Sequence, residues 1–355
     1  MGFNMIQTDY LIVGQGIAGT LFAHELEKHG RDFIVVDPGN HNASKTAAGM
    51  YNPVILKRFS PVWQGRQQIL TAKKTIAELA KLLSTRIDYP MPIWRIFHDD
   101  NEKATWQKKS QLDALSGLLS HQFLSNQNPR IAAPLGFGKV NLGGRIDLTT
   151  LLSGYRVYLS TSHRLLSETL DYDDLVFERD RVRYRQHIEA KKIVCCEGYS
   201  IKQNPYFNDL PLQGNKGEVL LVKAPNLSLS AAIKSNIFIM PMAELGNDMY
   251  FVGATYNWMD KDDIPSEAAK RQLLDKLSHF VHTDIEVTSH RAGMRPTVVD
   301  RRPLLGRHPK QANLYILNGL GTRGVMLGAT MTRWLYHFIE DNEPLHDAVD
   351  IRRFY

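Results

Sequence analysis

The feature that most constrains this chain is a glycine-rich turn between a short apolar run and a helix near the N-terminus. Residues 10–13 are continuously apolar, as in a strand buried on both faces of a parallel sheet, and the pattern G-x-G-x-x-G follows at residues 14–19. Residues 17–28 have apolar positions at helical spacing, and residues 33–36 form a second apolar run. This order of strand, turn, helix and strand predicts the first half of a doubly wound α/β domain.

Each glycine of the turn has its own physical task. Gly14 allows the tight turn, Gly16 lets the backbone approach a pyrophosphate, and Gly19 lets the helix pack closely on the strand. The phosphates of a dinucleotide would lie beside Ile17 and Ala18, where the helix dipole and unpaired N–H groups favour an anion. A tight turn without a ligand is the alternative interpretation.

An acidic residue follows the second apolar run, where ribose is bound in such domains. Asp37, next to Pro38, stands 23 residues beyond Gly14, close to the ~20 expected. Its carboxylate would accept hydrogen bonds from ribose hydroxyls and repel a 2′-phosphate, which favours FAD or NAD over NADP. Ala23 and Gly30 extend the glycine pattern into a form that resembles the adenine-dinucleotide motif of large FAD enzymes, so FAD is preferred.

Three further segments resemble one family, the D-amino-acid oxidase, glycine oxidase and sarcosine oxidase superfamily of FAD enzymes. Residues 44–50 are similar to its S-x-x-A-A-G loop, residues 293–306 to its G-x-R-P…D…P-x-x-G pattern, and residues 319–325 to its C-terminal flavin loop. The resemblance implies a cofactor-binding set that includes, beyond the glycine turn and Asp37, the residues Pro38, Ser44, Thr46, Ala47, Ala48, Gly49, Met50, Gly198, Gly319, Gly321, Thr322, Arg323, Gly324, Val325 and Met326. Non-covalent FAD is expected, because Thr46 stands where some relatives attach the flavin through a histidine, and no cysteine lies near residues 319–325.

The rest of the chain alternates between helical and strand patterns, which predicts two interleaved domains. Apolar spacing predicts helices at 67–83, 147–154 and 266–281 and strands at 193–196, 218–222, 237–240, 249–254, 284–289 and 314–318, while residues 87–144 have little pattern. The predicted fold class is α/β, with a Rossmann-like FAD-binding domain at 1–86, 145–210 and 290–355. It is interleaved with a mostly antiparallel β-sheet substrate domain at 87–144 and 211–289, an arrangement that resembles D-amino-acid oxidase.

The resemblance also implies which residues bind the substrate. It places Arg295 beside the flavin as a clamp for a carboxylate, since a planar guanidinium can bind both oxygens; an ordinary ion pair with Asp300 is the alternative. Arg323 is a second candidate for the same role, although glycine oxidase has its loop arginine one position earlier. Tyr51 and Tyr256 are candidates for the pocket wall, with burial in the core as the other interpretation.

The reaction implied by the resemblance is oxidation of the C–N bond of a small amino acid, or of a secondary amine bearing a carboxylate. It proceeds by hydride transfer to flavin N5, followed by hydrolysis of the imine. This chemistry needs an aligned C–H bond, an unprotonated amine and a fixed carboxylate rather than a catalytic His or Cys. Phe251 stands where the sarcosine-oxidase branch has an oxygen-activating lysine, so oxygen, a quinone or another carrier is left open as the electron acceptor.

Two other functions compete with this one. The loop at 319–324 also resembles the oxidase domain of the bifunctional enzyme that trims a carboxymethyl group from a modified tRNA wobble uridine, whose substrate is a secondary amine with a carboxylate. The formal net charge of +6 suits a tRNA partner, but the basic residues are dispersed and a methyltransferase partner domain is missing from the sequence. A non-catalytic flavin-binding protein is the second alternative.

Composition and the remaining motifs bear on the number of domains, metal binding and the cellular compartment. The 355 residues suffice for two domains, and a chain that is 43% hydrophobic and 23% charged is neither disordered nor a disulfide framework. Cys195 and Cys196, the only cysteines, are adjacent in an apolar run, which indicates buried strand residues in a reducing compartment. His279 and His282 have helical spacing but no third ligand, so no metal is expected. The start of the chain lacks a signal-peptide pattern and no apolar window could span a bilayer, so we expect a cytoplasmic enzyme with a small-molecule amine or amino-acid substrate; oligomeric state is left open.

Overall fold

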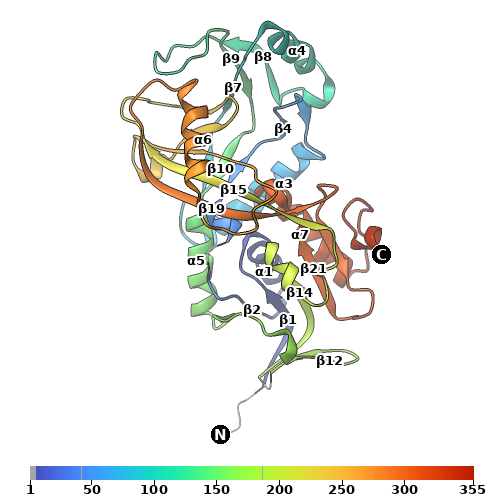
Figure 1. The fold of residues 1–355 in the computed structure, drawn as a ribbon. Helices are drawn as coiled ribbons and strands as arrows, with labels where there is room; N and C mark the ends of the chain where they lie inside the picture. The colour runs from blue at the N-terminus through green and yellow to red at the C-terminus, as the bar shows by residue number, and fades with distance from the viewer. Residues whose placement is uncertain (1–4, 41, 186) are drawn as a thin grey trace.

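The computed structural model describes residues 5–40, 42–185 and 187–355. Figure 1 shows the N-terminal strands in the lower half of the view and the strands of a second sheet above them; each sheet has eight strands. The prediction of an α/β fold with two kinds of sheet is confirmed. Residues 1–4, on which part of the expectation about targeting rests, lie outside the described residues. Among the helices that are described, none is both long and apolar enough to cross a bilayer.

The first sheet is built around the predicted N-terminal unit. β1 (Ile6–Val13) pairs in parallel with β2 (Phe33–Val36) on one side and with β14 (Ile188–Cys195) on the other. β14 also pairs in parallel with β21 (Leu314–Asn318). The sheet is completed by β11 (Leu165–Leu166) beside β2, β13 (Val182–Tyr184) and β12 (Leu175–Phe177) beyond β14, and β20 (Leu304–Arg307) beside β21.

Alternate residues of β1 supply two different cores, which explains its continuous apolar run. Tyr10 and Ile12 pack with helices on one face, namely α1 (Ile17–Lys28), α3 (Gly65–Leu82), α5 (Leu148–Thr161) and α7 (Gly324–Glu340). Leu11 and Val13 pack on the opposite face with residues of β12, β13 and β20. Because both faces of the strand are covered, polar residues are excluded from this half of it.

The second sheet is mostly antiparallel and is ordered β19, β15, β18, β17, β16, β7, β9 and β8. In chain order its strands are β7 (Ile93–Ile96), β8 (Leu119–Leu124), β9 (Phe137–Val140), β15 (Leu212–Lys223), β16 (Ala232–Lys234), β17 (Phe238–Pro241), β18 (Met249–Gly253) and β19 (Glu286–Val298). α6 (Glu267–Ser278) covers one face, where Leu273 and Leu277 pack with Tyr250 and Val252. On the opposite face, Ile93, Val140 and Met240 pack in another core with Trp106, and other residues of that face line the cavity described below.

The longest strands of this sheet lead toward the first one. β15 and β19 pair from Leu212 opposite Val298 to Lys223 opposite Glu286. The predicted domain boundary at residue 290 falls inside β19. Because β19 pairs with β15 on both sides of this residue, residues 290–298 also lie in the second sheet. Thr46 Oγ1, at the end of α2 (Ala43–Thr46), donates to the carbonyl of Ala292 at 3.0 Å. This bond ties β19 to the segment that follows the first sheet's second strand.

Most elements match their predictions with shifted boundaries, but two predictions need correction. The helix predicted at 147–154 extends to Thr161 in α5. The region 87–144, predicted to have little pattern, contains α4 (Asp100–Ser110). Only Trp106 and Ser110 of this helix are buried, so its sequence lacks the apolar spacing that predicts a helix. Five short strands complete the fold, namely β3 (Met50–Tyr51), β6 (Asp88–Pro90) and β10 (Gly144–Ile146) in one small sheet and β4 (Val54–Ile55) and β5 (Ser60–Pro61) in a hairpin.

Candidate active site

A single large cavity of about 1270 Å³ begins at the carboxyl ends of β1, β2, β14 and β21 and continues along the second sheet. Ligands bind at this end of the strands in open α/β sheets. The volume exceeds the roughly 300–1,000 Å³ of ordinary small-molecule sites, so it has room for a dinucleotide and a substrate together. The predicted cofactor residues that line it are Gly14, Gly16, Ile17, Ala18, Asp37, Pro38, Ser44, Thr46, Ala47, Ala48, Gly49, Met50, Gly198, Gly321, Thr322, Arg323, Gly324, Val325 and Met326.

Two members of the predicted cofactor set, Gly19 and Gly319, do not line the cavity. A Cβ on Gly19 would lie 1.9 Å from the carbonyl oxygen of Gly14, so this glycine serves the close packing of α1 on the turn. A Cβ on Gly319 would lie 2.5 Å from a methyl of Val298. Both glycines therefore make room for neighbouring protein atoms rather than for a ligand.

The glycine turn itself opens toward the cavity. Gly14 has φ +99°, a conformation that favours glycine, and its N–H donates to the carbonyl of Val36 at 2.9 Å. A Cβ on Gly16 would meet only the Oγ of Ser44, at 3.4 Å, so the remaining space beside Gly16 belongs to the cavity. The same Oγ accepts a hydrogen bond from the N–H of Ile17 at 3.2 Å. The first turn of α1 thus faces the cavity with N–H groups that the helix itself cannot satisfy.

Asp37 is held in place by donors from three segments. One carboxylate oxygen accepts from the N–H of Gln15 at 2.7 Å, and the other accepts from the N–H of Gly39 at 2.7 Å. Arg156, on α5, forms an ion pair with the second oxygen at 2.9 Å. Sequence reasoning missed Arg156, because it lies 119 positions from Asp37 and no local pattern links them. The carboxylate is therefore oriented before any ribose arrives.

Two residues after α2, Gly49 and Tyr51, are constrained by contacts within the protein. Gly49 has φ +70°, and a Cβ there would lie 1.9 Å from the carbonyl oxygen of Ile146. Tyr51, predicted for the pocket wall, does line the cavity, but it is only 3% exposed and its hydroxyl donates to Asp88 at 2.9 Å. Tyr51 is therefore a core residue that also reaches the cavity wall, and its part in a substrate pocket stays a prediction.

Arg295 is a half-buried cation in the cavity wall with no acidic partner among the described residues. Its Nη1 donates to Asn215 Oδ1 at 2.8 Å and to the carbonyl of Thr255 at 3.1 Å, both neutral acceptors. The alternative pairing with Asp300 is wrong, because Asp300 pairs with Arg353 at 2.9 Å. Burial lowers the pKa of Arg295, yet a guanidinium stays protonated at neutral pH, so the site offers an unneutralised charge to a ligand.

Two neighbours shape the surroundings of this guanidinium. A Cβ on Gly217 would lie 2.0 Å from Arg295 Nη2, so only glycine leaves the arginine its place. The ring of Tyr256 lies 4.5 Å from the guanidinium carbon, in cation–π contact, and Tyr256 lines the cavity as predicted. Arg323 lines the same cavity; burial and the charges of Arg301 and Arg302 lower its pKa, while Tyr256 opposes that effect. The structure therefore brings both predicted arginines and Tyr256 to one wall.

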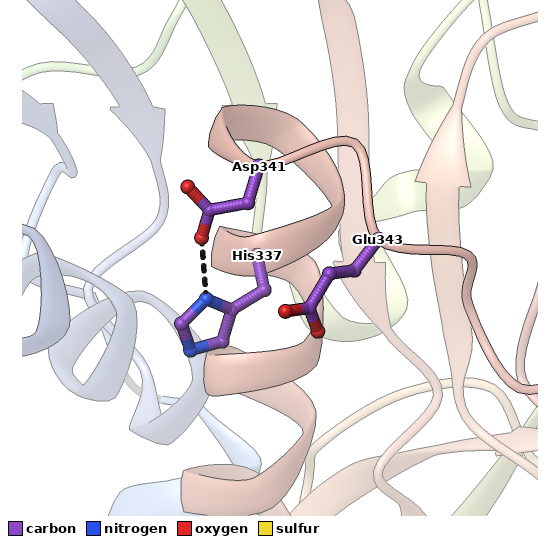
Figure 2. Close-up of side chains that lie close together, drawn as sticks. All are labelled: His337, Asp341 and Glu343. Carbon is purple, nitrogen blue, oxygen red and sulfur yellow. Dashed lines mark hydrogen bonds and ion pairs between the residues drawn. The ribbon is translucent and has the colours of Figure 1, made fainter.

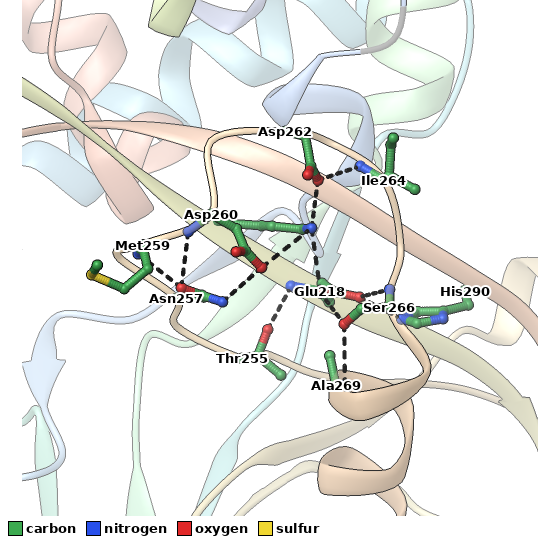
Figure 3. Close-up of polar contacts among 11 residues, drawn as sticks. Glu218, Thr255, Asn257, Met259, Asp260, Asp262, Ile264, Ser266, Ala269 and His290 are labelled. Carbon is green, nitrogen blue, oxygen red and sulfur yellow. Dashed lines mark hydrogen bonds and ion pairs between the residues drawn. The ribbon is translucent and has the colours of Figure 1, made fainter.

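Tyr256 is carried by residues 255–266, which we call the strap. Figure 3 shows the contacts that tie the strap to β15. Its two ends meet Glu218: the N–H of Thr255 donates to the Glu218 carbonyl at 3.1 Å, and the N–H of Ser266 donates to the Glu218 carboxylate at 2.7 Å. The middle is held by Lys216, whose Nζ lies 2.5 Å from Asp262. Burial alone would lower the pKa of Lys216, but its hydrogen bond and ion pair with Asp262 raise it.

Lys216 is therefore a positioning residue, and its replacement tests the strap. We expect Lys216→Met to raise KM for carboxylate substrates about 5- to 30-fold with a much smaller change in kcat, because about 1–2 kcal/mol of strap docking is lost. Lys270→Met, which removes an exposed pair with Glu267, is the control and should behave like the parent enzyme. An unchanged KM in Lys216→Met, or a fall in kcat alone, would show that the strap does not hold the substrate wall.

A separate polar cluster lies at the C-terminal end of α7, outside the cavity (Figure 2). His337 Nδ1 lies 2.6 Å from the carboxylate of Asp341, and Glu343 is the third member. The spacing of His337 and Asp341 is that of an i, i+4 pair on one helix, and both acids are exposed. Ordinary helix-end pairing accounts for the cluster, and the expectation of no metal stays a prediction.

Comparison with known proteins identifies the family to which this site belongs. A family model described as FAD dependent oxidoreductase matches residues 9–337. The chain belongs to this family. As a FAD-dependent oxidoreductase, it presents a cavity that fits the cofactor: the first turns of α1 and α7 both line it, Asp37 lines it directly after β2, and Gly16 leaves it open.

This oxidoreductase is similar over nearly its whole length to enzymes named glycine oxidase. It is 24% identical to glycine oxidase of Geobacillus kaustophilus, with 96% of this chain and 94% of that protein covered. A crystal structure of glycine oxidase from Geobacillus kaustophilus superposes with a TM-score of 0.79 at 21% identity, covering 98% of both chains. Iminodiacetate oxidase from Chelativorans sp. BNC1 superposes with a TM-score of 0.71 at 20% identity, covering 95% of this chain and 96% of that one.

A bifunctional protein is also similar. The tRNA 5-methylaminomethyl-2-thiouridine biosynthesis bifunctional protein of Legionella pneumophila is 23% identical over 92% of this chain and 53% of its own length.

The oxidoreductase has further polar groups in the cavity wall that sequence reasoning missed, among them Glu197. Glu197, two residues beyond the end of β14, accepts hydrogen bonds from the hydroxyl of Tyr172 and from Asn204 Nδ2, the latter at 2.8 Å. Burial raises the pKa of Glu197. An acid just beyond a buried strand was the available signal, since such positions face the ligand end of a parallel sheet. Cys195 and Cys196, just before it, are buried and free, which confirms their predicted place in a strand end.

Proposed function

We propose that this enzyme oxidises the C–N bond of a small amino acid, or of a secondary amine that carries a carboxylate. Bound FAD supplies a two-electron acceptor for this chemistry. The substrate loses two electrons as a hydride from carbon and a proton from nitrogen, and water then splits the resulting imine into a carbonyl compound and an amine. The observation that carries the proposal is Arg295, a half-buried guanidinium that lines the cavity without an acidic partner among the described residues.

The protein's own residues position the substrate in this proposal. Asn215 and the Thr255 carbonyl hold Arg295 through Nη1, which leaves its Nη2 and Nε for the two oxygens of a carboxylate. Tyr256 covers one face of the guanidinium, which limits its hydration and strengthens its attraction for an anion. A carboxylate fixed at one point aligns the neighbouring C–N bond, and this alignment is the largest contribution that side chains need to make.

The similarity to glycine oxidases over 96% of the chain supports the proposed chemistry, and membership of an oxidoreductase family favours an enzyme over a flavin-binding protein without catalysis. We also propose a cytoplasmic location, supported by two adjacent cysteines that are both free.

Anaerobic bleaching of the flavin tests the proposal. The FAD-loaded enzyme is mixed with glycine, sarcosine, D-amino acids and L-proline, one at a time, and the flavin absorbance is followed. We expect at least one of these amines to reduce the flavin and to yield the matching carbonyl compound. Reduction by none of them would contradict the proposal as stated.

Trimming of a carboxymethylaminomethyl group on a tRNA wobble uridine is the second candidate function. It is supported by the similarity to the tRNA-modifying protein of Legionella pneumophila over 92% of this chain. The same Arg295 would bind the carboxylate of that secondary amine. Bleaching by the modified tRNA or its nucleoside, with no bleaching by free amino acids, would favour this function.

A further inference from the structure

The cavity extends well beyond Arg295 along the second sheet. Its far part is lined by Lys234 on β16, Phe238 on β17 and Phe251 on β18. β16 lies four strands from β19, which carries Arg295, in the order β19, β15, β18, β17 and β16. Neighbouring strands are ~4.8 Å apart, so β16 and β19 lie ~19 Å apart across the sheet. The register places Lys234 level with Arg291, four residues along β19 from Arg295, which separates the two basic residues further. A two-carbon amino acid cannot fill the space between them.

Lys234 stands in that far part without an acidic partner. Its Nζ donates to the carbonyl of Asn236 at 2.7 Å and lies 4.8 Å from the centre of the Phe238 ring. Among the described residues, no carboxylate lies within ion-pairing distance of it. Three acids of the cavity wall are engaged elsewhere: Asp37 pairs with Arg156, Asp262 pairs with Lys216, and Glu197 accepts hydrogen bonds from Tyr172 and Asn204.

The groups around Lys234 add positive charge instead of neutralising it. Arg95 lies opposite it on β7, donates to the carbonyl of Ser235 at 2.6 Å and pairs with Glu102. Burial, followed by the charges of Arg95 and Lys276, lowers the pKa of Lys234 to about 7. An anion bound beside the ammonium group would supply the missing counter-charge. It would thereby offset the free-energy cost of burying that charge and the repulsion from Arg95 and Lys276.

We propose that the cavity accepts amine substrates with a second anionic group, which binds Lys234 while the first carboxylate binds Arg295. This inference rests on the proposed function and specifies its substrate class: an elongated amine with an acid at each end. For an N-substituted glycine of this class, oxidation removes a hydride from the glycyl carbon and a proton from nitrogen, and FAD takes up both electrons. Water then adds across the C=N bond and releases glyoxylate and the amino acid that formed the distal part.

Matched substrates test the inference. N-substituted glycines of increasing length that end in a carboxylate, a phosphate or an uncharged amide are mixed anaerobically with the holoenzyme, and kcat/KM for flavin reduction is compared. We expect kcat/KM to be about tenfold or more higher for the acidic substrates than for the amides of the same length. We expect Lys234→Gln to lower this acid-to-amide ratio of kcat/KM about tenfold or more. Lys223→Gln, an exposed lysine in the same sheet, is the control and should keep the preference.

Binding supplies a readout that does not need turnover. Calorimetric titration with a dicarboxylate that has an ether oxygen in place of the amine should show about tenfold weaker binding to Lys234→Gln than to the parent holoenzyme. An equal acid-to-amide ratio in both proteins, or equal slowing of every substrate in Lys234→Gln, would overturn the inference. If no amine bleaches the flavin, the proposed function fails, whereas the titration still decides whether Lys234 binds an anion.

Discussion

Replacing Arg295 with methionine will lower kcat/KM for carboxylate substrates about 30-fold or more, with FAD still bound. The guanidinium is half-buried and has no acidic partner among the described residues, so its ion pair with a substrate would be partly shielded from water. Truncating one partner of such a pair costs about 2–5 kcal/mol, and every 1.4 kcal/mol is a factor of ten. Steady-state kinetics, together with the flavin content of the purified protein, measure both parts of this expectation.

The matched control is Arg291→Met, because Arg291 is an exposed arginine on the same strand that contacts Ser289. It should retain the parent kinetics. Arg295→Lys keeps the charge but loses the planar fork, so we expect it to recover only part of the lost kcat/KM. Parent-like kinetics of Arg295→Met on a carboxylate substrate would remove Arg295 from the binding site.

Gly16→Val will weaken FAD binding about 5- to 150-fold while leaving the fold of the apoprotein intact. Gly16 has φ −77°, which ordinary residues adopt, and an added Cβ would meet only Ser44 Oγ, at 3.4 Å. The valine side chain would therefore occupy the space of the pyrophosphate, and crowding of this kind costs about 1–3 kcal/mol. Titration of the apoprotein with FAD measures the loss, and its melting temperature checks the fold.

Gly19→Ala gives the contrasting result because the same addition there collides with protein. Its Cβ would lie 1.9 Å from the Gly14 carbonyl oxygen, so we expect a lower melting temperature of the apoprotein itself. If Gly16→Val binds FAD as the parent does, the pyrophosphate does not lie over the start of α1. The two variants thus distinguish a glycine required for FAD binding from a glycine required for helix packing.

The first strand, turn and helix are predictable because their signals are local. β1 must exclude polar residues where both faces are covered, and the turn must contain glycine at Gly14, where φ is +99°. α4 escapes the same reasoning because Trp106 and Ser110 are its only buried residues. A different local signal was available: Asp99 accepts from the N–H of Glu102 at 2.7 Å, in the manner of a helix cap.

The sequence alone determined the glycine-rich turn and the α/β fold of this protein, whereas Arg295 was selected as a carboxylate clamp by the resemblance to a family. Only the tertiary structure decides what surrounds that residue: Asn215 beside it, the strap across it, and Lys234 four strands away. The physical reason is that contacts between distant segments depend on strand register. A shift of one residue would turn each of these side chains to the opposite face of the sheet.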